Sequence, residues 1–348
     1  METIRPDAGF IRDVMASGGG DLKKCFQCAN CSAVCALAPE DAPFPRRQMI
    51  ETQWGLKDRV LADPAIWLCH NCGDCTTYCP RGARPGDVLG ALREQAVKHF
   101  AFPRFLAQWA SSPKALPLVF LIPMLVFAAI ALWAPKPAGD GRLEFANLFP
   151  IPVLEGLFFG LSGLVLMFFI VSLLRFVKAA GGRVRAGGVV SADVLMQKKL
   201  RDCDVKRHTG HLLIFWGFMG LAITGTLVGI GTMFGVLRTP LDLTSPFKLF
   251  ANVAGLVAVV GIMMRWGSLR NGTYFDKFFF LTLAGVLATG ILSQLMRLAQ
   301  QEVAMYVVYF VHLTLIFALF LYAPFSKFAH LAYRSVALAL VRKEGYGR

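Results

Sequence analysis

The sequence has few charged side chains. Asp, Glu, Lys and Arg make up 17% of its 348 residues, whereas 55% of the residues are hydrophobic. Soluble domains carry about 25% charged residues, so this composition excludes an ordinary soluble protein. It indicates a protein with membrane-spanning segments.

Acidic side chains are scarcer than basic ones, 22 against 36, which gives a formal net charge of +14. Residues 1–107 hold 13 basic and 12 acidic residues, so nearly all of the excess positive charge lies in the hydrophobic remainder. That distribution is typical of loops that orient membrane spans and does not match the basic face of a nucleic-acid-binding domain. We expect membrane lipid as a partner and no nucleic acid.

Cysteine is almost absent beyond residue 80, where Cys203 stands alone. The first 24 residues lack the apolar core of a secretory signal, which predicts a cytoplasmic first domain. Thiols stay reduced in the cytoplasm, so metal ligation is favoured over disulfides for the eight earlier cysteines.

These eight cysteines form two runs of the pattern C-x2-C-x2-C-x3-C: Cys25, Cys28, Cys31 and Cys35, then Cys69, Cys72, Cys75 and Cys79. In two-cluster ferredoxins the first three thiolates of a run bind one 4Fe-4S cluster and the fourth binds the other. The spacing predicts one cluster on Cys25, Cys28, Cys31 and Cys79 and a second on Cys69, Cys72, Cys75 and Cys35. Zinc is the alternative, but structural zinc sites pair two C-x2-C knuckles and have no use for the other cysteines of each run.

Two helices are expected around these runs. Residues 46–61 carry apolar side chains at roughly helical spacing and end before Asp63-Pro64, and residues 87–102 have an amphipathic pattern. A helix between the runs favours the all-α type of two-cluster ferredoxin over the compact type, which has strands there. We therefore expect an α-helical ferredoxin domain over residues 1–107, followed by a transmembrane domain over residues 108–348.

Six stretches of the second domain are long and apolar enough to cross about 30 Å of hydrocarbon as helices. They are roughly 116–134, 152–176, 210–236, 248–266, 277–296 and 303–325. An even number of spans places both termini on one side of the membrane. The prediction is an all-α, six-span bundle of the b-type cytochrome kind.

Lys and Arg indicate which side that is. Residues 175–207 hold nine of them, residues 265–277 three and residues 327–348 five. The opposite loops hold Lys136, Arg142, Arg238, Lys248 and Arg297. The positive-inside rule therefore predicts a multi-pass protein of the cytoplasmic (inner) membrane, with the ferredoxin domain and both termini in the cytoplasm.

Four histidines lie in or beside the predicted spans. His208 and His211 precede or begin the third span, His312 lies within the sixth and His330 lies just beyond it. Ionisable residues in spans are rare and usually functional, and imidazoles from two facing helices can serve as the axial ligands of haem b. Glycines at 210, 217, 220, 225 and 229 would let a macrocycle approach the third span, or would serve helix packing.

Depth in the membrane pairs these histidines. His211 and His330 both lie near the cytoplasmic face and are expected to hold one haem, with His208 as a competing ligand. At 1.5 Å per residue, His312 lies about 27 Å deeper than His330. It would serve a second haem, for which the third span offers no histidine and Met219 is the nearest soft ligand.

The segment 312–330 resembles the last haem helix of the nitrate reductase gamma subunit, with two histidines 18 apart and Pro-Phe-Ser before the second. That family's partner helix carries two histidines ten apart. Here His211 matches the first and Leu221 stands at the second position, so the resemblance supports one haem and leaves a second haem open. Residues 1–105 resemble the C subunit of heterodisulfide reductase, and the membrane part is similar to that enzyme's haem-bearing membrane subunit.

Joined in this order, the two parts look like the C subunit of the quinone-interacting membrane-bound oxidoreductase (Qmo) family. This resemblance implies soluble flavin and iron-sulfur partners of the Qmo A and B type. It also implies electron exchange between menaquinone, or ubiquinone, and adenylylsulfate reductase in dissimilatory sulfur metabolism. We expect a redox carrier within an oxidoreductase complex, because the sequence offers no nucleophile, phosphate loop or acid–base pair of its own.

Three alternatives stay open. One is a heterodisulfide-reductase-type membrane anchor with the same cofactors and different soluble partners. Another is a quinol-driven ion pump, although the predicted spans lack the chain of acidic residues that pumps use. The third is a non-redox membrane scaffold whose cysteines hold zinc. The direction of electron flow and the place of the quinone stay open as well.

Overall fold

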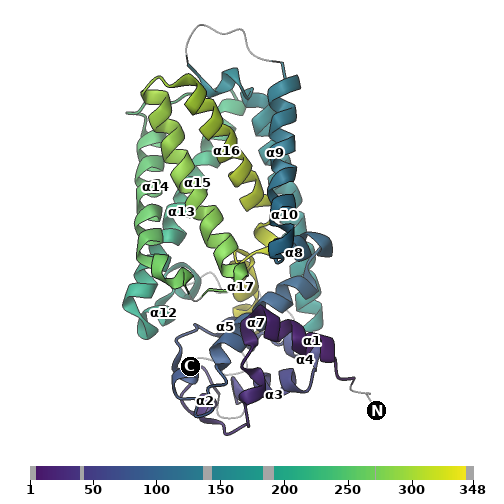
Figure 1. Cartoon of the computed structure of the whole chain (residues 1–348). Coiled ribbons are helices and arrows are strands. Elements are labelled where there is room, and N and C mark those ends of the chain that lie inside the picture. The colour runs from purple at the N-terminus through teal and green to yellow at the C-terminus, as the bar shows by residue number, and fades with distance from the viewer. Residues whose placement is uncertain (1–4, 40–42, 136–142, 183–191, 271, 342–348) are drawn as a thin grey trace. The chain divides into compact units, whose positions relative to one another are not determined.

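The computed structural model describes residues 5–39, 43–135, 143–182, 192–270 and 272–341. Every regular element in these ranges is a helix, which confirms the all-α prediction (Figure 1). The helices form two compact units. The cluster unit contains Met1–Gln108, Met167–Asp204 and Pro324–Arg348, and the bundle unit contains Trp109–Leu166 and Val205–Ala323.

The cluster unit is built mostly from short helices. They are α1 (Ala8–Val14), η1 (Met15–Gly19), η2 (Leu22–Lys24), α2 (Asn30–Ala33), α3 (Arg46–Gln53), α4 (Lys57–Ala62), α5 (Ala65–Leu68), α6 (Asp74–Thr77), α7 (Pro85–Phe100), α8 (Arg104–Ala110), α11 (Ala192–Leu195), α12 (Lys198–Cys203) and α17 (Ala329–Val341). Helix α1 begins where Asp7 accepts a hydrogen bond from the Phe10 amide at 2.9 Å, a standard N-cap. Helix α7 begins with Pro85 in its first turn, where the missing amide hydrogen costs nothing, and confirms the helix expected over residues 87–102.

The single helix expected over residues 46–61 is wrong, because α3 and α4 are separate helices. Gly55 lies between them with φ +69°, a conformation that glycine adopts without strain. Its carbonyl accepts a hydrogen bond from the Asp7 amide at 2.9 Å. A Cβ at Gly55 would lie 2.7 Å from that same nitrogen. The break therefore depends on a distant segment that helical periodicity does not reveal.

The core of the cluster unit joins three parts of the chain. Helix α7 buries Val88, Leu89, Leu92 and Val97, and Trp67 from α5 packs with them. Phe176, from the C-terminal half of helix α10 (Ile151–Ala179), and Tyr333, from α17, belong to the same core. Each fully buried large side chain contributes about 1.5–3 kcal/mol of hydrophobic stabilisation. The predicted domain of residues 1–107 thus shares its core with two later helices.

The bundle unit consists mainly of long apolar helices: α9 (Leu116–Trp133), the first half of α10, α13 (Val205–Met233), α14 (Pro246–Arg265), α15 (Tyr274–Leu298) and α16 (Glu302–Leu321). Shorter turns are η3 (Pro113–Ala115), η4 (Phe145–Asn147), η5 (Trp266–Leu269) and η6 (Ala323–Phe325), the last at the boundary between the units. Six helices of the described residues are long and apolar enough to cross a membrane, which agrees with the six predicted spans and indicates a multi-pass membrane protein.

Small residues bring α13 and α14 together. A Cβ on Gly217 would lie 2.7 Å from the Ala254 carbonyl oxygen and 2.7 Å from the Ala258 amide nitrogen, and a Cβ on Gly220 would lie 2.9 Å from Ala254 Cβ. Such close approach is a common way for membrane helices to associate. Gly217 and Gly220 therefore serve helix packing, and they give no support to a haem on that face of α13.

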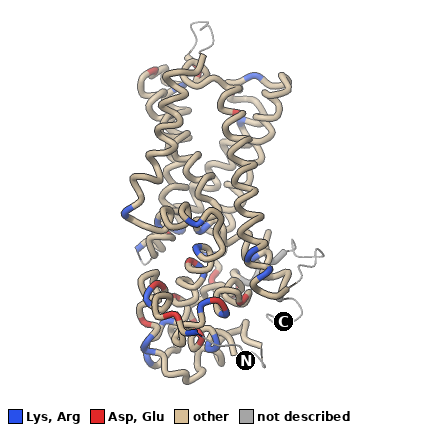
Figure 2. Tube along the Cα trace, turned by 90° about the vertical axis from the view of Figure 1, so that its right-hand side faces the viewer, with Lys and Arg blue, Asp and Glu red and all other residues tan. Residues whose placement is uncertain are grey.

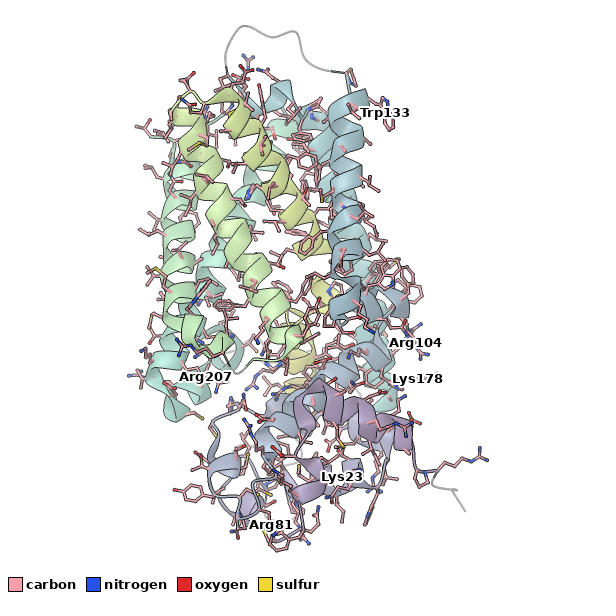
Figure 3. All side chains as sticks on the ribbon, viewed as in Figure 1. Lys23, Arg81, Arg104, Trp133, Lys178 and Arg207 are labelled. Carbon is pink, nitrogen blue, oxygen red and sulfur yellow. The ribbon has the colours of Figure 1, made fainter. Side chains whose placement is uncertain are left out.

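Charged residues of the bundle unit lie near the ends of its helices (Figure 2). Arg207 and Trp133 mark opposite ends of this unit (Figure 3), and Arg265 ends α14 on the side where α13 begins. Which side of the membrane each end faces stays a prediction. Seven basic residues used in the positive-inside argument lie outside the described residues: Lys136, Arg142, Arg183, Arg185, Arg342, Lys343 and Arg348.

Candidate cluster and haem sites

Four cysteines line one pocket of the cluster unit. They are Cys25, Cys28 and Cys31 of the first run and Cys79 of the second, and the pocket has an empty volume of about 320 Å³, part of it open to solvent. Arg46 and Arg81 also line it. The structure thus brings together the four residues predicted to bind the first cluster, including the one drawn from the other run.

The other four cysteines also lie together. The thiol of Cys75 interacts electrostatically with Cys69, Cys72 and Cys35, and Cys35 in turn interacts with Cys69 and Cys72. This set is the one predicted for the second cluster. Their ligation of iron stays a prediction, but both crossed groupings are present in the fold.

Burial raises the pKa of Cys75 to about 12 and that of Cys31 to about 11, and the neighbouring cysteines raise both pKa values further. Thiols buried together resist ionisation because a thiolate there would be poorly solvated and close to other thiolates. A bound iron centre supplies the positive charge that removes this penalty. The donor set therefore suits a group that binds several thiolates at once.

The two runs share one backbone design. In the first, Gln27 and Ala29 have φ angles of 65° and 70°, and in the second, Asn71 and Gly73 have φ angles of 53° and 99°. Left-handed residues other than glycine are uncommon. Here they stand at equivalent places in both loops, on either side of the second cysteine of each run. Helices α2 and α6 then begin directly after Ala29 and Gly73.

Hydrogen bonds to sulfur complete the cluster surroundings. The amides of Asn71 and Ala83 donate to the Sγ atoms of Cys69 and Cys79 at 3.2 and 3.3 Å, and Gln27 Nε2 donates to Cys25 Sγ at 3.4 Å. Such bonds help to set the reduction potential of an iron-sulfur cluster. The cysteine spacing gives no hint of Gln27 or Ala83, which sequence reasoning missed.

Zinc is the alternative occupant of these cysteines. In the part of the chain that the structure describes, no group of three or more His, Cys, Asp or Glu side chains could hold a single metal ion. Structural zinc draws four ligands to one atom at about 2.0–2.3 Å, whereas a cubane spreads its cysteines over four irons. The sequence argument for clusters over zinc therefore remains the number and spacing of the cysteines in each run.

The histidines predicted as haem ligands belong to different elements. His208 and His211 lie in the first turns of α13, His312 lies on α16 and His330 lies on α17. The depth of about 27 Å assumed one continuous helix from His312 to His330. That assumption is wrong, because α16 ends at Leu321 and α17 begins at Ala329 after a turn that contains Pro324. The pairing of His211 with His330 stays a prediction.

His312 is held by helix α15. Its Nδ1 lies 3.0 Å from the hydroxyl of Thr289, and that hydroxyl donates to the Gly285 carbonyl at 2.7 Å. Because the hydroxyl hydrogen is used in that bond, the Thr289 oxygen accepts from His312 Nδ1–H. This tautomer leaves Nε2 as an acceptor, the form required of a metal ligand or of a partner for a quinol hydroxyl. Gly290 gives the ring room, since a Cβ there would lie 2.9 Å from Cε1.

Two polar groups near His330 fit a bound ligand. The Trp67 ring lies 5.8 Å from the His330 ring, centroid to centroid, and stacks on Tyr333 at 4.7 Å. Trp67 Nε1 and the Tyr333 hydroxyl are buried and have no hydrogen-bond partner among the described residues. A buried unpaired donor costs about 1–3 kcal/mol. Acceptor oxygens on a group bound at His330, such as the carboxylates of haem, would satisfy these two donors.

Residues 21–83 match the family model of the 4Fe-4S dicluster domain. Over 93 residues the chain is 38% identical to the C subunit of the H(2):CoB-CoM heterodisulfide,ferredoxin reductase of Methanothermobacter thermautotrophicus, an alignment that covers 26% of this chain and 50% of that protein. Over 85 residues it is 34% identical to a protein of Archaeoglobus profundus described as like the C subunit of heterodisulfide reductase, with coverage of 24% and 45%. The chain spans about half the length of these relatives.

A third relative is similar over the full length. The chain is 26% identical over 379 aligned positions to citrate utilization protein B of Escherichia coli, which covers 97% of this chain and 94% of that protein. No solved structure matches the chain. The chain thus carries a 4Fe-4S dicluster domain in residues 21–83 and is similar in its N-terminal part to the C subunit of heterodisulfide reductase.

Proposed function

We propose that this chain is the membrane subunit of a quinone-linked oxidoreductase complex and carries electrons between a membrane quinone and soluble partner subunits. One observation carries the proposal. A single chain contains two cysteine groups suited to cubanes and also six helices able to cross a membrane. A soluble ferredoxin needs no such helices. A membrane part gives the electron path access to a lipid-soluble quinone, either menaquinone or ubiquinone.

The cysteines hold the two clusters in crossed sets. Cys25, Cys28, Cys31 and Cys79 bind one 4Fe-4S cluster, and Cys69, Cys72, Cys75 and Cys35 bind the other. When bound, the clusters and haem b supply reversible one-electron oxidation and reduction. The chain's own contribution is to hold these groups, to donate hydrogen bonds to their sulfurs and to limit their contact with water.

His211 and His330 are the residues that would hold the iron of one haem b, with His208 as the competing residue on α13. His312 is the candidate ligand for a second haem. The Thr289 contact, which leaves His312 Nε2 as an acceptor, supports a role for this histidine either in metal binding or in contact with a quinol.

The soluble partners are proposed from resemblance. Likeness to the Qmo family favours flavin and iron-sulfur subunits of the A and B type, with adenylylsulfate reductase of dissimilatory sulfur metabolism as the enzyme they serve. The full-length match to citrate utilization protein B favours a second candidate, an electron-transfer protein that serves the use of citrate. Heterodisulfide-reductase-type soluble partners are the remaining alternative.

Absorption and EPR spectra of the purified full-length chain test the cofactor part of this proposal. We expect about eight iron atoms per chain, EPR signals from two reduced clusters and a haem Soret band that shifts on reduction. A chain that contains zinc, with neither cluster signals nor a Soret band, would contradict the proposal and support the scaffold alternative.

The partners are tested by isolating the intact complex from its native membrane. Flavin and iron-sulfur subunits that reduce or oxidise adenylylsulfate reductase would support the sulfur assignment. Co-purification with a citrate-linked enzyme would support the second candidate instead. Recovery of the chain without any redox partner would contradict both assignments.

Membrane orientation is tested with reporters fused to the C-terminus. The proposed cytoplasmic location predicts that a fluorescent protein that folds only in the cytoplasm is active there, and that a periplasmic phosphatase is inactive at the same position. The opposite pattern would place the termini outside the cytoplasm.

A further inference from the structure

Arg334 on α17 binds the loop that carries the second cysteine run. Its Nη1 donates to the carbonyl oxygens of Trp67 at 2.9 Å and Leu68 at 3.1 Å, and its Nη2 lies 3.0 Å from Nδ1 of His70. These three residues lie directly before and after Cys69. Because Arg keeps its charge at all ordinary pH values, it places a permanent positive charge beside the proposed second cluster.

A second guanidinium group also binds this loop. Arg93 on α7 donates to the carbonyls of Ile66 at 3.1 Å and Cys69 at 3.4 Å. The last carbonyls of a helix have no partner within the helix, and α5 ends at Leu68. Arg93 and Arg334 together provide those partners, so the position of Cys69 is fixed by α7 and α17.

One face of α17 collects the relevant side chains. His330, Tyr333 and Arg334 are spaced i, i+3 and i+4, so they lie on the same side of the helix. Trp67 is 1% exposed, stacks on Tyr333 with an interplanar angle of 17° and contacts His330. The Trp67 ring therefore lies between the backbone that leads to Cys69 and the histidine proposed to bind haem.

A purely structural role would account for the aromatic packing alone. Phe176 and Phe100 pack in the same core through their rings, with centroids 5.5 Å apart. Arg334 does more than pack, because its positive charge lies beside the backbone around Cys69. It therefore interacts with the charge of any cluster that Cys69 binds. Attraction between opposite charges is strong in a partly buried setting.

We propose that Arg334 and Trp67 couple the second cluster to the group held by His330. Arg334 raises the reduction potential of the cluster on Cys69, Cys72, Cys75 and Cys35, because reduction adds one negative charge beside its guanidinium. Trp67 fills the space between Cys69 and His330 and keeps the two redox groups close. Both are positioning residues, and the inference rests on the proposed function.

The coupled step is the transfer of a single electron. One redox group is oxidised by one electron and the other is reduced by one electron. No bond forms or breaks, and no proton is needed. The rate depends on the separation of the two groups and on the packing between them, so a void at Trp67 slows it.

Redox titration of the full-length protein, followed by EPR, tests the charge effect of Arg334. The C28S and C72S variants assign the signals to the first and second clusters. We expect R334M to lower the midpoint potential of the second cluster alone and R334K to restore most of it. For a one-electron couple, a tenfold change in the equilibrium constant for reduction of the cluster corresponds to a shift of about 59 mV in its midpoint potential. The matched control is R81M, because Arg81 lines the first pocket; it is expected to shift the first cluster and not the second.

Stopped-flow absorption tests the role of Trp67, with a soluble menaquinol analogue as the reductant. We expect W67A to slow electron exchange between haem and the second cluster, and W67F to retain most of the rate. F176L, which disturbs the same core away from His330, is expected to leave the rate near that of the parent protein.

The proposal is overturned if R334M keeps both clusters and leaves the second midpoint unchanged, or if W67A and F176L slow the exchange equally. If R334M loses its cluster, R334Q takes its place in the same titration, and an unchanged second midpoint in R334Q overturns the charge effect. A parent protein without haem would refute the proposed function, whereas the shift in the cluster potential would still be measurable. The two failures are therefore distinguishable.

Discussion

Two cluster cysteines are expected to react slowly with alkylating reagents in the metal-free protein. The thiolate is the reactive form, and burial raises the pKa of Cys75 from 9.0 to about 12 and that of Cys31 from 9.0 to about 11. Cys203 is exposed and lies outside both runs, so it serves as the internal reference.

The size of the effect follows from these pKa values. At pH 8 a thiol with a pKa of about 12 is about 1000-fold less ionised than a thiol with a pKa of 9.0. Its thiolate is more basic and therefore reacts about 20-fold faster, which offsets part of that loss in rate. Cys75 is therefore expected to react about 50-fold more slowly than a thiol with a pKa of 9.0, and by the same arithmetic Cys31 about tenfold more slowly.

The assay is alkylation with iodoacetamide after iron removal, with each site quantified by mass spectrometry. Circular dichroism establishes that the helices persist, and the denatured chain supplies the rate of each unprotected cysteine. Equal rates at Cys75, Cys31 and Cys203 in a protein that keeps its helices would refute the buried grouping.

The same shifts set the pH dependence of stability in the metal-free protein. A thiol with a raised pKa in the folded state binds its proton more tightly there than in the unfolded chain. Its stabilising contribution is therefore complete below about pH 9 and falls as the pH rises from there towards the folded pKa. Thermal unfolding temperatures are expected to drop over that alkaline range, and a constant unfolding temperature would contradict the assignment.

Three further outcomes are expected. The C35S variant alters the EPR signal of the second cluster and C79S that of the first; the reverse assignment would refute the crossed sets. Replacing Gly55 with Ala lowers the free energy of unfolding by at least about 1–2 kcal/mol, because φ is +69° there, and an unchanged urea midpoint would contradict this. Replacing Thr289 with Val, or His312 with Ala, lowers the haem content measured as pyridine haemochrome if His312 binds a second haem, whereas an unchanged content of one haem per chain excludes His312 as a ligand.

The cysteine spacing predicted more than the presence of clusters. It predicted that Cys79 joins the first three cysteines and that Cys35 joins the later three, and the fold brings together these two sets. The crossed prediction rests on the fact that three thiolates on one tight loop leave a cubane with one open position, and ligation of iron by these sets stays a prediction. The six long helices were equally accessible to sequence reasoning, because an apolar run of sufficient length is a property of the segment alone.

Long-range contacts were not accessible in the same way. The break at Gly55 depends on Asp7, and the end of α5 depends on Arg93 and Arg334. Nothing in the local pattern around Arg334 distinguishes it from the other basic residues of 327–348. From sequence, its charge indicates only which side of the membrane the C-terminus faces. Its contacts with Trp67 and Leu68 become visible only when α17 joins the core of the cluster unit.

The central claim is that electrons pass between a quinone and the clusters within this single chain. Its most direct test is the anaerobic addition of a menaquinol analogue to the purified full-length protein, followed by haem absorption and by cluster EPR in frozen samples. The account predicts a shift of the haem Soret band and growth of a reduced-cluster signal, with the second-cluster signal diminished in the C72S variant. A protein that contains both clusters and haem but shows no reduction of either group by quinol would contradict the claim.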